Sequence, residues 1–170
     1  MNPSGDSQIL SLLVTGLSTG AVYGLMAIGL TLIFGVMRVI NFAHGTFIVL
    51  AMYVVILLYD LGIDPYLSIL IVAPAMFLLG ALVYQATLAP LVNRGSSHTS
   101  QAVATLGVAL IMVNLILVWE GGEGQVIRTS YSTSTIEFGE VVISVPRLIG
   151  FIASLLIALG AALVLRRTWL

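Results

Sequence analysis

The chain has 170 residues, of which 59% are hydrophobic and only 8% are charged. Soluble domains carry about 25% charged residues, so this composition indicates a protein that lies in a lipid bilayer. A formal net charge of -1 offers no basic face for nucleic acid, and the lack of cysteine excludes disulfides and thiolate metal sites. No metal-binding or phosphate-loop motif is recognisable, so we expect no metal, no cofactor and no catalytic residues.

Five charge-free intervals are long enough to cross a hydrocarbon core of about 30 Å, which takes roughly 20 helical residues. They predict an all-α, multi-pass membrane protein with a single transmembrane domain over residues 1–170. The N-terminus has no signal-peptide pattern, so the first interval is expected to stay in the mature protein. The predicted helices are Ile9–Met37, Phe42–Tyr59, Tyr66–Ala89, Ala102–Trp119 and Leu148–Leu165.

The first predicted helix contains a row of glycines, Gly16, Gly20 and Gly24, spaced four residues apart. Rows of small residues let a second helix approach closely in lipid. We expect this row to serve helix packing, either within the chain or at a subunit interface.

Three polar residues, Arg38, Asn41 and His44, lie close together between the first and second predicted helices. They are compatible with a solvated cytoplasmic turn. They are equally compatible with a helix break near Asn41–Gly45 at membrane depth, where non-helical backbone is tolerated only beside protein or a water-filled cavity. Broken helices of that kind commonly form the substrate path of transporters.

The fourth predicted helix carries Thr105 and Asn114. A spacing of nine residues rotates one against the other by about 900°, which is half a turn out of phase, so they are predicted to lie on different faces. After this helix comes a polar segment at about 121–140, rich in Gly, Ser and Thr. This composition predicts a small extracytoplasmic hairpin or ordered loop, which either has no specific role or acts as a lid or docking surface.

Orientation follows from the arginines, because short loops rich in Lys or Arg stay in the cytoplasm. Arg94 and the pair Arg166 and Arg167 are separated by two crossings and can both be cytoplasmic. We therefore predict a protein of the cell (inner or plasma) membrane with an extracytoplasmic N-terminus and a cytoplasmic C-terminus.

The segment from Gly16 to Tyr53 closely resembles the N-terminal region of permease subunits of branched-chain amino acid ABC transporters. The most specific part of the resemblance is the run Ile40, Asn41, Phe42, Ala43, His44, Gly45. Further support comes from Tyr23 to Leu32, from Ala104 to Gly107, and from Asn114 with Leu115.

The resemblance implies a permease subunit that pairs with a second related permease, binds two cytoplasmic ATPase subunits and receives substrate from an extracytoplasmic solute-binding protein. ATP hydrolysis would then belong to the partners, and the chain itself would not be an enzyme. Substrates in such a family are mainly leucine, isoleucine and valine. The first, second and fourth helices would line the path, with candidate residues Tyr23, Asn41, Phe42, His44, Gly45, Thr105 and Asn114.

Family members continue past the position of Arg167 into an ATPase-docking segment and further helices. The resemblance thus implies that the chain is an incomplete permease. Two alternatives stay open at this point. One is an oligomeric channel or facilitator for a small neutral solute such as urea or amides, and the other is a non-conducting structural subunit.

Overall fold

The computed structural model describes residues 5–122, 124–138 and 141–168, which fall into two compact units. One unit is Leu32–Ile127, and the other joins the described residues up to Thr31 to those from Arg128 onward. The boundary falls within the first helix, and each of the other helices lies within a single unit. The expectation of a single transmembrane domain stays a prediction.

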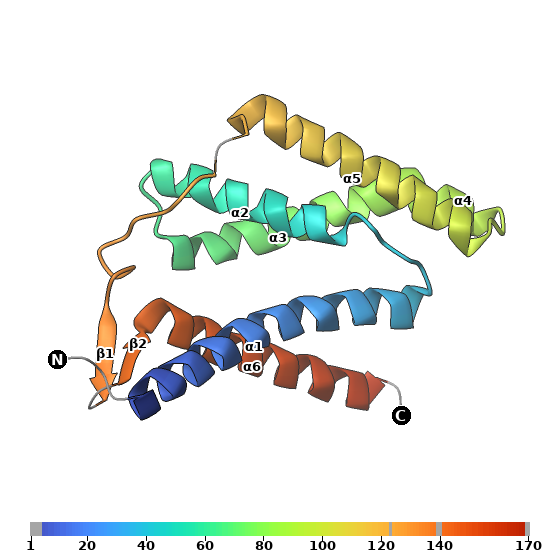
Figure 1. The fold of residues 1–170 in the computed structure, drawn as a ribbon. Helices are drawn as coiled ribbons and strands as arrows, with labels where there is room; N and C mark the ends of the chain where they lie inside the picture. The colour runs from blue at the N-terminus through green and yellow to red at the C-terminus, as the bar shows by residue number, and fades with distance from the viewer. Residues whose placement is uncertain (1–4, 123, 139–140, 169–170) are drawn as a thin grey trace. The chain divides into compact units, whose positions relative to one another are not determined.

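The unit Leu32–Ile127 is built from α-helices and one π-helical turn (Figure 1). Three of its elements follow one another without interruption and form one long apolar helix over Pro65–Asn93. The elements are α2 (His44–Asp60), α3 (Pro65–Val83), the π-helix η1 (Tyr84–Leu88), α4 (Ala89–Asn93) and α5 (His98–Glu120).

A tight turn joins α2 to α3. Gly62 has a φ of 86°, a conformation that glycine adopts without a Cβ clash, and its N–H donates to the Tyr59 carbonyl at 2.9 Å. Asp64 then caps α3, because its carboxylate accepts the Tyr66 N–H at 2.8 Å, and Pro65 occupies the first turn where no N–H is needed. The turn therefore reverses the direction of the chain, and α3 packs against α2.

α5 presents one buried face to this unit. Its buried residues recur every three or four positions, which is the spacing of one side of a helix. They are Gln101, Thr105, Ala109, Met112 and Ile116. α5 begins at a Ser97 cap and ends at Gly121, whose φ is 76°. Thr105 thus lies on the inward face of a helix with defined ends.

Small polar residues occupy the closest helix contacts, while large apolar side chains face outward. Ser68 on α3 is fully buried and Thr46 on α2 is nearly so, whereas Leu70, Phe77 and Val118 are more than 70% exposed. Small residues inside and apolar residues outside are typical of helices that pack in lipid. The described residues include four helices long and apolar enough to span a membrane, plus the shorter α2, so the predicted all-α architecture of about five apolar helices is confirmed.

The other unit contains α1 (Gly5–Met37) up to Thr31, a two-stranded sheet and α6 (Val145–Thr168). The strands β1 (Thr135–Phe138) and β2 (Val141–Ser144) are antiparallel, with Thr135 opposite Ser144. Of these strands only β1 falls within the polar segment 121–140, and residues 123 and 139–140 lie outside the described residues, so the extracytoplasmic hairpin or loop expected there stays a prediction. A Cβ built on Gly150 would lie 4.0 Å from Val22, so α6 passes close to α1 at this point.

The predicted break between the first two helices is present, but it lies earlier in the chain. Residues 38–43 are non-helical, and α2 resumes at His44. Consequently His44 and Gly45, expected within the break, form the first turn of α2. The physical reason is that α1 already ends at Met37, where the backbone of the next residue turns left-handed.

Candidate functional site

Arg38 ends α1 through its backbone. Its φ is 52°, in the left-handed region, and its N–H still donates to the Phe34 carbonyl at 2.8 Å. A residue with a Cβ pays about 1–2 kcal/mol for this conformation, which is why glycine or asparagine usually occupies it. The helix therefore stops here by geometry rather than by a proline or glycine signal.

Asn41 organises the second half of the break. Its side-chain Oδ1 accepts the Ala43 N–H at 3.0 Å, and its backbone carbonyl accepts the His44 N–H at 3.3 Å. An asparagine that folds back on the chain two residues ahead forms a local turn and prepares the start of a helix. Asn41 thus sets the direction in which α2 begins.

Thr105 on α5 holds the break from the other side. Its Oγ1 accepts the Phe42 N–H at 3.1 Å and lies 3.2 Å from the Ile40 carbonyl, while the Ala102 carbonyl in its own helix lies at 2.9 Å. Only 1% of Thr105 is exposed. The contacts to Phe42 and Ile40 join residues more than 60 positions apart and satisfy backbone groups that the missing helical turn leaves free.

The break packs two of its side chains into the unit, while Arg38, Ile40 and Phe42 are exposed. Val39 is 2% exposed and Ala43 is 1% exposed, so both ends of the break are anchored by buried side chains. A plain solvated turn would leave such residues accessible. Of the two interpretations of this segment, the burial of Val39 and Ala43 favours non-helical backbone that faces protein.

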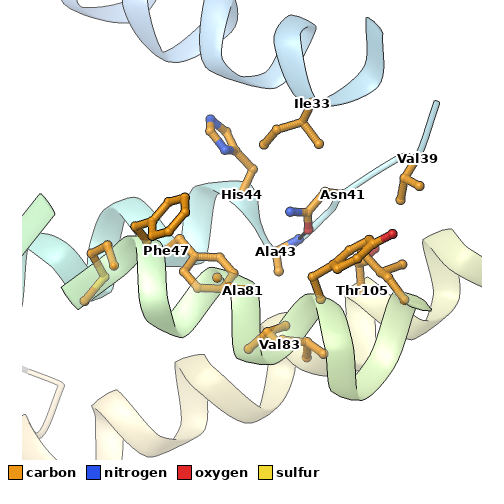
Figure 2. A pocket seen from close by; sticks show the side chains of 15 residues that line it. Ile33, Val39, Asn41, Ala43, His44, Phe47, Ala81, Val83 and Thr105 are labelled. Atoms are coloured by element: carbon orange, nitrogen blue, oxygen red, sulfur yellow. Dashed lines mark hydrogen bonds between the residues drawn. The ribbon is translucent and has the colours of Figure 1, made fainter. Parts of the chain in front are cut away.

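A cavity of about 450 Å³ opens beside the break. Figure 2 shows Ile33, Asn41 and His44 at this cavity together with Ala81, Val83 and Thr105 from α3 and α5. Most of the lining is apolar, and the polar side chains come from Asn41, His44, Tyr84 and Thr105. The remaining lining residues are Val39, Ala43, Phe47, Met76, Phe77, Gly80, Leu88 and Val108. An apolar cavity with a few polar groups suits a small, mostly apolar ligand.

The π-helix η1 forms part of the cavity wall and was not predicted. Its last bond runs from the Ala89 N–H to the Tyr84 carbonyl, five residues back, directly before Pro90. Proline has no N–H and clashes with the preceding turn, so a widened turn is a way to accommodate it. Tyr84 and Leu88 both line the cavity. Pro90 was the available sequence signal for this irregularity.

The structure brings three of the predicted path residues to this cavity, namely Asn41, His44 and Thr105. Phe42 and Gly45 are adjacent in the chain but exposed. Asn114 lies on an exposed part of α5, where its side-chain amide donates to the Leu110 carbonyl at 2.7 Å. Thr105 is buried and Asn114 is exposed, in agreement with the half-turn offset expected from their spacing. A role of these residues in transport stays a prediction.

Tyr23 lies in the other unit, at a separate cavity of about 390 Å³. Ser18, Met26, Arg147 and Gly150 also line this cavity. Arg147 Nη1 donates to Thr15 Oγ1 at 3.5 Å, and the buried Ser18 hydroxyl donates to the Val14 carbonyl at 2.8 Å. Tyr23 is therefore grouped with α6 and not with the other predicted path residues.

The glycine row of α1 is uncovered within the described part of the chain. Gly16, Gly20 and Gly24 are exposed, and a Cβ built on any of them would have no described atom beyond the local helix within 4 Å. No described neighbour in its own unit packs on this row, so the predicted packing stays a prediction.

Residues 12–170 match the family described as branched-chain amino acid transport system / permease component. The chain belongs to this family. It is accordingly a permease component of multi-pass membrane type and not an enzyme.

Three curated relatives show the extent of the likeness. The high-affinity branched-chain amino acid transport system permease protein BraD of Pseudomonas aeruginosa is 28% identical over 173 residues, covering 94% of this chain and 55% of BraD. The probable branched-chain amino acid transport permease protein LivH of Methanocaldococcus jannaschii is 40% identical over 96 residues, covering 54% of this chain and 29% of that protein. LivH of Escherichia coli is 26% identical over 124 residues, covering 66% of this chain and 39% of that protein. The chain thus spans about half the length of BraD and less of the others, and no solved structure matches it.

Proposed function

We propose that the chain contributes part of the substrate path of an ATP-driven importer of branched-chain amino acids. The observation that carries this proposal is the mainly apolar cavity of about 450 Å³ beside a packed helix break. Apolar walls suit the side chain of leucine, isoleucine or valine, while Asn41 and His44 supply polar groups for the charged backbone of an amino acid. The names of the relatives point to the same class of substrate.

The length of α2 supports a break at membrane depth. Its 17 residues extend about 25 Å, which is less than the hydrocarbon core of about 30 Å. If the Asp60 end of α2 lies at one interface, the His44 end lies inside the core. The cavity would then be reached from within the membrane rather than from a surface loop.

The proposed assembly has a second related permease, two cytoplasmic ATPase subunits and an extracytoplasmic binding protein. ATP hydrolysis takes place in those partners. Arg166 and Arg167 form the last turn of α6, and Arg94 follows α4, so we place these arginines in the cytoplasm and the N-terminus outside. A reporter that is active only in the cytoplasm, fused after residue 167, tests this orientation; its inactivity would reverse it.

Uptake of labelled leucine by the complete transporter tests the path. His44→Ala and Asn41→Ala are each expected to lower uptake at least about tenfold at normal membrane levels, since each removes a polar group from the cavity wall. His98→Ala and Asn93→Ala are matched controls, because both residues are exposed and lie outside the cavity lining. Uptake that is unchanged in both cavity variants would reduce the break to a structural turn.

Reconstitution into liposomes separates this proposal from a channel. The importer requires the ATPase and ATP for leucine accumulation. Flux of urea or an amide through the chain alone, without ATP or partners, would contradict the importer and favour a facilitator.

A further inference from the structure

The Thr105 hydroxyl has more hydrogen-bonding partners than it can serve at one time. The Phe42 N–H donates to it, and two carbonyls, of Ile40 and Ala102, lie within reach of its single proton. The hydroxyl can donate to only one of them at a time. If the hydroxyl donates to the Ile40 carbonyl, two hydrogen bonds join α5 to the break. If it donates to the Ala102 carbonyl, that bond lies within α5 and only the Phe42 bond joins α5 to the break.

The two break contacts of Thr105 lie on either side of Asn41. The Ile40 carbonyl precedes the Asn41 residue and the Phe42 N–H follows it, so the hydroxyl spans its backbone. Asn41 in turn directs the start of α2 through its bonds to Ala43 and His44. The placement of Asn41 in the break and of His44 at the start of α2, both of which line the cavity, is therefore tied to one buried side chain of α5.

We propose that Thr105 is a positioning residue whose hydroxyl latches the helix break onto α5 and thereby holds Asn41 and His44 at the cavity wall. It touches backbone rather than substrate, so its role differs from that of a path-lining ligand. If α5 shifts relative to the helix break, the hydrogen bonds of Thr105 must be lost or exchanged. The latch is therefore where a movement of α5 changes the positions of the residues at the cavity wall. The effect on transport rests on the proposed function, but the latch itself does not.

Thiol labelling of the complete transporter measures the latch without any transport. Because residues 1–170 contain no cysteine, Val39→Cys introduces one thiol into this segment, at a position that is 2% exposed in the break. The label is read on this segment after the subunits are separated and digested, so that thiols elsewhere in the transporter are not counted. Thr105→Val keeps the shape of the side chain but removes the hydroxyl, leaving the Phe42 N–H without its acceptor. We expect it to raise the labelling rate by a small methanethiosulfonate about tenfold, since an unpaired buried donor destabilises the packed state.

Two further variants separate the hydroxyl from packing. Thr105→Ser retains the hydroxyl and Thr105→Ala does not, although both lack the methyl group. The labelling rate of Thr105→Ser is expected within about twofold of the parent rate, and that of Thr105→Ala is expected near the rate of Thr105→Val. If Thr105→Val fails to accumulate in membranes, the comparison of serine with alanine tests the hydroxyl in its place. Thr99→Val, at an exposed threonine in the first turn of α5, is the matched control and should label like the parent.

Leucine uptake by the same variants shows whether the latch serves transport. Thr105→Val and Thr105→Ala should lower uptake severalfold, with Thr105→Ser close to the parent. The latch is overturned if labelling is the same with and without the hydroxyl, or if serine behaves like alanine. Labelling that responds without any loss of uptake overturns the positioning role. If labelling responds while even the parent carries no leucine, the proposed function fails and the latch stands.

Discussion

The two units of the chain differ in their buried apolar residues, which in the described part of the chain all lie in Leu32–Ile127, Val72, Ala109 and Ile116 among them. In Leu32–Ile127, Ser68 and Thr105 are buried and bonded, and 28% of the most apolar window of α5 is buried. In the other unit, Ser18 and Ser154 are buried but no described apolar residue is, and the glycine row contacts no described neighbour within that unit. The first arrangement is that of a helix cluster with its own core. The second is that of a unit whose described buried residues are small and polar.

The largest effect should come from filling the core of Leu32–Ile127. Ser68→Leu adds bulk at a fully buried position and removes the hydrogen bond from its hydroxyl to the Asp64 carbonyl. Overpacking of this kind costs about 1–3 kcal/mol of unfolding free energy. Thermal unfolding in detergent measures it.

Ala27→Leu is the matched change in the other unit, because Ala27 is exposed on α1. It should leave the unfolding temperature nearly unchanged. Equal destabilisation by both variants would mean that the two units do not differ in packing as described.

A smaller effect is expected at the end of α1. Arg38→Gly relieves the left-handed backbone at φ 52° and should stabilise the chain by at most about 1 kcal/mol, reduced by the greater freedom of glycine in the unfolded state. Arg38→Val, with a branched side chain in the same conformation, should destabilise it. If both variants lower the unfolding temperature equally, the Arg38 side chain and not its backbone stabilises the helix end.

The smallest effect on the chain itself is expected from Gly20→Ile. No described atom beyond the local helix lies near a Cβ at this position, so the substitution should change stability by no more than about 0.5 kcal/mol, through helix propensity alone. If the glycine row packs against another subunit, the same variant should nevertheless reduce co-purification of the second permease severalfold. Normal co-purification would contradict packing of the glycine row against the second permease and would indicate that the row faces lipid.

The helices were predictable because scarcity of charge over about 20 residues is a property of each segment by itself. The break could be located only approximately, since Asn41 and His44 mark polarity whereas the backbone conformation that ends α1 occurs at Arg38, a residue type that gives no such signal. The Thr105 contacts join α5 to a segment more than 60 residues away, and no local pattern encodes that pairing. Pro90 signals an irregular turn but does not specify a π-helix, so η1 too needed the structure.

The shortness of α2 has a further consequence for the surrounding lipid. With 17 residues, α2 is too short for an average bilayer, whereas α5 with 23 residues extends about 35 Å and can tilt to fit. A change in bilayer thickness therefore acts unequally on these two neighbours. The two helices are joined at the hydrogen bonds between Thr105 and the residues that precede α2, so a shift of α2 in response to bilayer thickness would strain these bonds beside the cavity.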